Sequence, residues 1–468
     1  MKNFNDDSQE AIINSLVNDD INRRKHVFNL IKLVMSMTGN QVIALNGSWG
    51  SGKTFFIKQF ELLVNILNNY DANGELINEA LRTNNLVCLK ELTPDQILSI
   101  NNVINSMEED YRTCFSENLT NCLYFNAWEY DNNEEPILSL IYKIINDFPY
   151  LITEVSEEKF SKIKLALDVI ISSATKGSIK FSDYATSQNL LDAIITSEEL
   201  KSKINVVFDE LLKENGNKMV VVIDELDRCK PTYAIKLLEQ IKHFINNENI
   251  IVILCANIPQ LSCTIKKQYG YRFSVEEYLD KIIDLTISLP PTSIKEYFQA
   301  IPLESIMRST NWLKEVLLHY INYRNLEMRS INRYLSMMQF FEKHIYLKDR
   351  MPSDQKTLFE YVFLPYCIGE QIFSSTNYKA FVSGNGFEEF FNYIDSSETI
   401  KEIIDLCIYR FTKKENRDIK NDMSLIYNRI YTNLDINIYN QIRNFQINES
   451  DKKYFFELCT MLSDFTIE

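Results

Sequence analysis

The sequence predicts an α/β fold, in which helices cover both faces of a parallel β-sheet and an all-helical C-terminal part follows. Three observations support this prediction. Short apolar runs alternate with segments of helical periodicity, a glycine-rich loop follows the first apolar run, and the strand pattern fades after Pro291. Strands buried on both faces appear as continuous apolar runs, whereas half-exposed strands alternate, so the sheet should be parallel.

Five strands are expected, each a short apolar run, at residues 41–46, 122–128, 218–223, 250–255 and 285–289. An amphipathic helix should precede the first strand and end before Gly39, and Pro136 is placed to begin another helix. Residues 295–345 and 353–468 have helical periodicity and are rich in tyrosine and phenylalanine.

The octapeptide between the first strand and the next helix is the most informative part of the chain. It has the spacing G-x-x-x-x-G-K-T of a phosphate-binding loop and holds three of the chain's 11 glycines. Glycine lets the backbone approach phosphates closely, in conformations that a Cβ would block. A glycine-rich turn beside a chance lysine is disfavoured, because strand, loop and helix agree. The expected nucleotide-binding residues are Gly47, Ser48, Trp49, Gly50, Ser51, Gly52, Lys53 and Thr54.

Within this loop two side chains have expected chemical roles. Lys53 should place a positive charge at the β- and γ-phosphates, and Thr54 should offer a hydroxyl ligand to Mg²⁺. The third strand ends in the acids Asp224 and Glu225. We expect Asp224 to hold the Mg²⁺ shell and Glu225 to act as the base that deprotonates the attacking water. The alternative is that both acids merely cap the strand.

Asn257 follows the fourth strand directly and has two interpretations. A polar side chain at that position can lie beside the γ-phosphate and report on hydrolysis. Alternatively, Asn257 caps a helix whose first turn contains Pro259.

The bulk composition is that of an ordinary globular protein. The net charge of −15 argues against a broad nucleic-acid-binding surface, but it does not exclude a local basic groove. Nine cysteines without a C-x-x-C pair suggest reduced thiols, and four widely spaced histidines suggest no metal site. The best apolar stretch, residues 163–174, is charged and shorter than the ~20 residues of a membrane span. We therefore expect a cytoplasmic protein without a membrane partner.

Four segments together resemble the KAP family of P-loop NTPases, over about residues 20–335. They are the phosphate loop with its tryptophan, Tyr-Phe-Asn-Ala-Trp-Glu-Tyr at 124–130, Ile-Asp-Glu-Leu-Asp-Arg-Cys-Lys-Pro at 223–231, and Tyr-Leu-Asp-Lys-Ile-Ile at 278–283. Many relatives carry transmembrane helices between the two nucleotide motifs. This chain has only the short charged stretch there, so it resembles a soluble member. The resemblance to prokaryotic members separately implies a defence-type protein.

The resemblance implies a strand order of 5-1-4-3-2, a catalytic glutamate and a helical lid after the fifth strand. The expected domains are a P-loop NTPase core at 1–291 with helical insertions at about 69–120 and 150–215, a helical lid at 292–349, and a helical C-terminal domain at 350–468.

Charge on a γ-phosphate in the transition state usually needs an arginine. Residues 325–335 resemble the arginine-bearing lid helix of the family, with Met328 in place of the usual proline. Arg329 and Arg333 are therefore the candidates within the same subunit. Arg272, between the fourth and fifth strands, is a candidate finger into a neighbouring subunit.

Three aromatic or basic residues of the matching segments have simpler expected roles. Trp49 and Trp128 are expected to be large packing residues, and Arg228 is expected to steady the acidic strand end through an ion pair.

The C-terminal part has no recognisable catalytic constellation, but it is rich in aromatic residues. They belong either to a helical core or to a docking surface for an effector. The residues concerned are Phe387, Phe390, Phe391, Tyr393, Phe455 and Phe456.

Together these features predict a Mg²⁺-dependent ATPase that uses ATP binding and hydrolysis to switch conformation or assembly. A homo-oligomer, an effector or co-encoded defence proteins as partners, and a role in antiphage defence are implied by the resemblance alone. An ATP-gated scaffold with negligible turnover and a small-molecule kinase are the alternatives.

Overall fold

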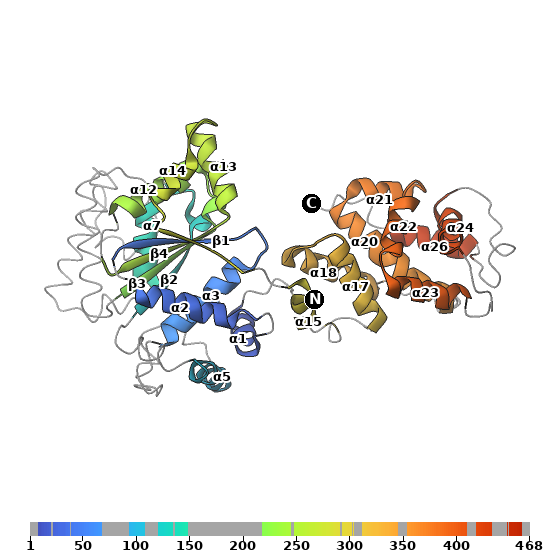
Figure 1. The fold of residues 1–468 in the computed structure, drawn as a ribbon, viewed down its shortest axis with the longest axis horizontal. Coiled ribbons are helices and arrows are strands. Elements are labelled where there is room, and N and C mark those ends of the chain that lie inside the picture. Colours follow the sequence, from blue (N-terminus) through green and yellow to red (C-terminus); the bar gives the residue numbers. More distant parts are fainter. Residues whose placement is uncertain are drawn as a thin grey trace. The chain divides into compact units, whose positions relative to one another are not determined.

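The computed structural model describes most of the chain and divides it into two compact units, residues 7–292 and 293–468, which we call the sheet unit and the helical unit (Figure 1). The expected insertion at 150–215 lies outside the described residues, as does most of 69–120. Described are residues 8–19, 22–37, 39–67, 93–107, 120–133, 136–147, 218–244, 248–290, 293–301, 303, 311–344, 353–409, 418–432, 447 and 449–460.

The sheet unit alternates strands and helices, as the sequence predicts. Its elements are α1 Gln9–Asn18, α2 Arg24–Ser36, β1 Gln41–Asn46, α3 Lys53–Leu67, α5 Pro94–Asn105, β2 Thr120–Asn126, the 3₁₀ turn η2 Ala127–Tyr130, α7 Pro136–Asp147, β3 Lys218–Asp224, the 3₁₀ turn η3 Leu226–Arg228, α12 Pro231–Phe244, β4 Ile250–Ala256, α13 Ile258–Tyr269, α14 Val275–Asp280 and β5 Leu285–Ser288.

The five strands form one parallel sheet in the order β2-β3-β4-β1-β5, which confirms the predicted order 5-1-4-3-2. The register aligns the carboxyl ends of neighbouring strands. Asn126 of β2 lies opposite Asp224 of β3, and Asn46 of β1 lies opposite Ala256 of β4. In an open parallel sheet this edge is where ligands bind.

Helices cover both faces of the sheet (Figure 1). The helices α1, α2, α3 and α5 pack on one face, where alternate β3 residues such as Val220 and Val222 join their core. The intervening residues, Val221 and Ile223, join a second core with α7, α12, α13 and α14. Because successive strand residues point to opposite faces, a strand covered on both sides must be apolar throughout.

The end of β2 corrects one predicted boundary. The strand ends at Asn126, and Trp128 lies in the 3₁₀ turn η2 rather than in the strand. The Asn126 side chain accepts a hydrogen bond from the Trp128 backbone N–H at 3.2 Å, and this cap turns the chain out of the sheet.

The helical unit is built of helices in its described residues, as the sequence predicts. Its elements are α15 Ile294–Ala300, α17 Asn311–Tyr323, α18 Met328–His344, α19 Ser353–Leu358, the π-helical turn η4 Phe359–Phe363, α20 Leu364–Phe373, α21 Ser375–Val382, α22 Phe387–Asp395, α23 Glu398–Tyr409, α24 Ile419–Tyr431 and α26 Glu449–Thr460.

Aromatic rings fill the core of the helical unit. Tyr320 of α17 lies 4.9 Å from the Tyr334 ring of α18 and 6.4 Å from the Tyr366 ring of α20, so residues before and after 350 share this core. Phe390, Tyr393 and Phe455 are buried, which confirms the core interpretation for them; Phe387 and Phe391 are partly buried and Phe456 is exposed. None of the helices described is long and apolar enough to cross a membrane.

Gly369 is required by this packing. A Cβ built there would meet the Tyr320 ring at 2.0 Å, and the Tyr320 hydroxyl donates to the buried Glu370 carboxylate at 3.0 Å. We expect Gly369→Ala to destabilise the helical unit by about 1–3 kcal/mol or more, because the ring must leave its site. Calorimetric unfolding of the full chain measures the effect. Thr376→Ala, an exposed change on α21, is the control; equal unfolding of both variants would contradict the prediction.

Candidate functional site

The phosphate loop joins the end of β1 to α3 and has the backbone that its glycines predict. Gly50 and Gly52 have φ angles of 81° and 84°, which residues with a Cβ rarely adopt. Gly47 is needed for a different reason, since a Cβ there would lie 2.9 Å from the Ser51 hydroxyl oxygen.

Lys53, the first residue of α3, is buried, and its ammonium turns back to the loop. It donates to the Gly47 carbonyl at 2.5 Å and to the Ser48 carbonyl at 2.9 Å. Burial lowers the pKa of Lys53, while Asp227 and Asp224 act in the opposite direction. A desolvated ammonium beside the amides of the loop is suited to an anionic ligand.

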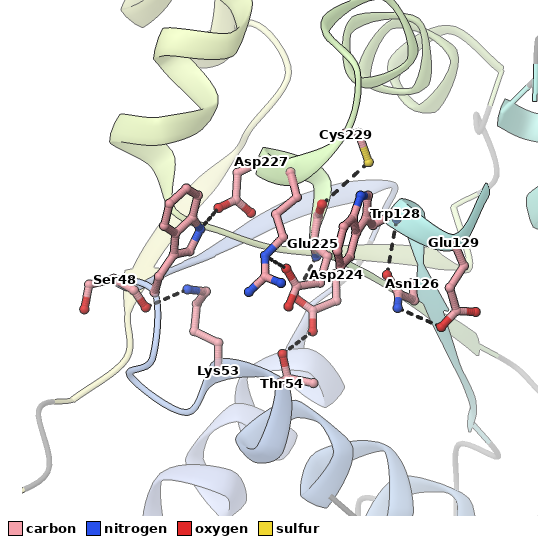
Figure 2. A network of polar contacts seen from close by, with 12 residues as sticks. Ser48, Lys53, Thr54, Asn126, Trp128, Glu129, Asp224, Glu225, Asp227 and Cys229 are labelled. Carbon is pink, nitrogen blue, oxygen red and sulfur yellow. Dashed lines mark hydrogen bonds and ion pairs between the residues drawn. The ribbon is translucent and has the colours of Figure 1, made fainter. Parts of the chain in front are cut away.

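Three donors hold the carboxylate of Asp224, and Figure 2 shows the contact from Thr54. Its Oδ2 accepts from the Thr54 hydroxyl at 2.7 Å and from the Tyr124 hydroxyl at 3.0 Å, and its Oδ1 accepts from the Glu225 backbone N–H at 2.8 Å. Asp224 is only 1% exposed. Burial raises its pKa, and these hydrogen bonds oppose that shift by stabilising the carboxylate.

Tyr124 was noted in the sequence only as part of a motif, and the structure places it on Asp224. Asn126 lies opposite Asp224 in the register, and Tyr124 is two residues earlier, so it points to the same face. Burial and then the Asp224 charge raise the pKa of Tyr124, which keeps its hydroxyl a proton donor. A hydroxyl within the apolar run at 122–125 was the available signal.

Glu225 follows Asp224 in an unusual backbone conformation. Its φ of 62° and ψ of 21° are left-handed, a conformation that costs a non-glycine residue of order 1–3 kcal/mol. The expected ion pair forms, because the Arg228 Nε contacts the Glu225 carboxylate. The Arg228 guanidinium carbon lies 5.4 Å from the centre of the Trp128 ring. The left-handed backbone at Glu225 therefore ends the strand, and Arg228 holds the Glu225 side chain through the ion pair.

Both tryptophans are more exposed than predicted. Trp49 is 43% exposed and Trp128 is 52% exposed, so the expectation that they are packing residues was wrong. Each holds a charged group instead: the Trp49 indole N–H donates to the Asp227 carboxylate at 2.5 Å, and Trp128 stacks on Arg228. The phosphate loop is thereby joined to η3, directly after the acidic end of β3.

Asn257 caps α13, which confirms the helix-cap interpretation. Its side-chain oxygen accepts from the Gln260 backbone N–H at 3.2 Å. Asn46, at the end of β1, accepts from the neighbouring Ile258 N–H at 3.1 Å.

Arg23 is a residue that sequence reasoning missed. It directly precedes α2 and is 4% exposed, and its guanidinium donates to the Ser51 carbonyl of the phosphate loop at 2.9 Å and to the Pro290 carbonyl at 3.1 Å. Arg23 is separated in the sequence by 28 residues from Ser51 and by 267 residues from Pro290. No local pattern signals such a contact.

The three arginines that were candidates from the sequence are exposed. Arg272 lies between α13 and α14, next to Tyr271, which is 93% exposed. Arg329 and Arg333 lie in α18, within the helical unit. Their proposed catalytic roles stay predictions.

Among the described residues no cluster of three or more His, Cys, Asp or Glu side chains could hold a metal ion by itself. Mg²⁺ beside a nucleotide needs only one or two protein oxygens, since phosphates and waters complete its six ligands. The Thr54 hydroxyl and the Asp224 carboxylate, which are hydrogen-bonded at 2.7 Å, would offer two such oxygens.

Comparison with protein families gives a match to the KAP family P-loop domain over residues 23–345, more than half of the chain. The chain belongs to the KAP family of P-loop NTPases. KAP membership agrees with the geometry of the phosphate loop and indicates nucleotide binding.

Other comparisons add little to the KAP assignment. Comparison with curated proteins finds no match. Among solved structures, the chain is similar to the Aeropyrum pernix ORC2 protein in ADPNP–ADP complexes, with 10% identity, 94% of each chain covered and a TM-score of 0.32. A TM-score this low supports no argument about the KAP chain.

Proposed function

We propose that this KAP protein is a Mg²⁺-dependent ATPase. The observation that carries the proposal is the hydrogen bond between Thr54 and Asp224, which joins the end of the phosphate loop to the end of β3 beside Glu225. This arrangement gathers a phosphate-binding loop, a pair of metal-binding oxygens and a carboxylate at one sheet edge.

In this proposal, Thr54 and Asp224 hold Mg²⁺, which supplies positive charge at the phosphate oxygens when bound. The amides of the loop and the Lys53 ammonium bind the β- and γ-phosphates. Asp224 suits this role because it is buried and yet held as an acceptor by three donors.

Glu225 is the proposed base. Its carboxylate takes a proton from water as the water oxygen bonds to the γ-phosphorus and the bond to the ADP oxygen breaks. In the structure the Arg228 Nε contacts one oxygen of this carboxylate, Oε2.

Phosphate release from purified protein tests the proposal against its main alternative. An ATPase releases phosphate continuously in Mg²⁺ without a second substrate. An ATP-gated scaffold binds ATP but releases negligible phosphate, and a small-molecule kinase needs an acceptor. Tight binding with no turnover would favour the scaffold.

Tyr124→Phe tests the metal assignment. We expect the Mg²⁺ concentration that gives half of the maximal Mg²⁺ effect on nucleotide binding to rise about tenfold. The reason is that the loss of a residue that orients a metal ligand weakens metal affinity on this scale. Affinity in EDTA should stay the same. Titration of a fluorescent nucleotide measures both. Tyr233→Phe, which removes a buried hydroxyl without a hydrogen-bond partner among the described residues, is the control. An unchanged Mg²⁺ dependence would contradict the role of Tyr124.

The biological setting is proposed from family analogy alone. Hydrolysis would switch the conformation or assembly of a homo-oligomer that acts with an effector or co-encoded defence proteins against phage. Arg272 is the proposed finger into a neighbouring subunit, Arg329 and Arg333 are the proposed lid arginines, and Asn257 is the proposed sensor of the γ-phosphate. Protein co-purification with and without ATP would test for the partner.

A further inference from the structure

Arg23 is a buried cation without a counter-ion in the part of the chain that the structure describes. Its guanidinium contacts two backbone carbonyls, those of Ser51 and Pro290, and its Nε has no hydrogen-bond partner there. The next residue, Arg24, behaves differently: it is partly exposed and pairs with the Asp19 carboxylate at 3.8 Å.

A buried charge of this kind is costly. Removing a guanidinium from water costs several kcal/mol, and carbonyl dipoles return only part of it in the absence of an opposite charge. Burial lowers the pKa of Arg23 to about 10, so the side chain still carries its charge at neutral pH. An anion bound nearby would offset this cost.

The contact with Ser51 also fixes the phosphate loop. A trans peptide unit is planar, so its carbonyl and the following N–H point in opposite directions. When Arg23 holds the Ser51 carbonyl, the Gly52 N–H must point away from Arg23. This peptide turns about ψ of Ser51 and φ of Gly52, and Gly52, which has a φ of 84° and lacks a Cβ, restrains that rotation little unless something holds the peptide.

We propose that Arg23 is a positioning residue for the bound polyphosphate: it clamps the Ser51–Gly52 peptide of the phosphate loop and supplies a buried positive charge that the phosphates compensate. This inference rests on the proposed nucleotide binding. It assigns a function to a residue outside every motif of the sequence.

The proposal has a signature that a purely structural arginine would not give. Replacing a buried charge that has no counter-ion among the described residues by an apolar side chain of similar length removes the desolvation cost of the guanidinium together with its hydrogen bonds to the Ser51 and Pro290 carbonyls. These two effects oppose each other, so the nucleotide-free protein should not become less stable to any large extent. The same change should weaken phosphate binding. Stability and affinity should therefore change independently or in opposite directions.

Arg23→Met, Arg23→Lys and the matched control Arg24→Met test this in the full-length protein. The thermal midpoint is measured without nucleotide, and the affinities for ATP and for inorganic tripolyphosphate are measured in EDTA. We expect Arg23→Met to lower the midpoint little, if at all, and to lose at least about tenfold in both affinities, equivalent to one charge-assisted contact. Arg23→Lys should lie between it and wild type, and Arg24→Met should bind like wild type.

Two results would overturn the proposal. An unchanged affinity in Arg23→Met would show that the phosphates do not depend on this residue. A midpoint that falls strongly together with the affinity would make Arg23 a structural residue. Failure of the wild-type protein to bind ATP or tripolyphosphate is a separate result, which would refute the proposed nucleotide binding instead.

Discussion

Glu225→Gln is expected to reduce the rate of ATP hydrolysis about 10²-fold or more while nucleotide binding is retained. A positioned general base contributes on this scale, and glutamine has nearly the same shape but cannot accept the proton. The backbone N–H of residue 225 should still donate to Asp224, so the metal-binding pair stays in place. The loss should therefore fall on turnover rather than on affinity.

Steady-state phosphate release and fluorescent-nucleotide binding measure the two effects separately. Glu129→Gln is the matched control, since Glu129 is an exposed carboxylate at the same sheet edge, where it accepts from the Asn126 side chain at 2.8 Å. Its turnover should match wild type. Equal ATPase rates in wild type and Glu225→Gln would refute the assignment of Glu225 as the base.

Lys53→Ala is expected to abolish nucleotide binding. The substitution removes the buried ammonium that contacts the Gly47 and Ser48 carbonyls, and with it a positive charge at the proposed phosphate site. The phosphates would then face these carbonyls without the Lys53 ammonium, and in this proposal only Mg²⁺ and Arg23 would be left to offset their charge, so binding of both ATP and ADP should be lost.

Equilibrium binding of a fluorescent nucleotide measures this loss, and thermal unfolding without nucleotide verifies that the variant is folded. Lys32→Ala removes an exposed positive charge from α2 and should bind like wild type. If Lys53→Ala bound ATP with wild-type affinity, the phosphates would not lie on this loop.

Local patterns in the sequence were sufficient for the fold class and for the proposed nucleotide-binding elements. The apolar runs at β1, β3 and β4 became the inner strands, because a strand covered on both faces leaves no position for a polar side chain except near its end. The edge strand β5 instead alternates half-buried and exposed residues. Asp224 and Glu225 follow such a run directly, so their place at the carboxyl edge of the sheet was predictable. The positive φ angles of Gly50 and Gly52 were also predictable, because the preference of glycine for this conformation is a local property of the residue.

Contacts between distant segments were decided only by the tertiary structure. Arg23, Ser51 and Pro290 meet because α2, the phosphate loop and the end of β5 converge, and no short pattern records that convergence. The exposure of Trp49 and Trp128 was mispredicted because a large aromatic residue near a strand usually packs inside. Here each indole is exposed and contacts a charged side chain of η3, Asp227 in one case and Arg228 in the other. The sequence determined which residues stand at the edge of the sheet, and the packing of remote elements decided which charges those residues face.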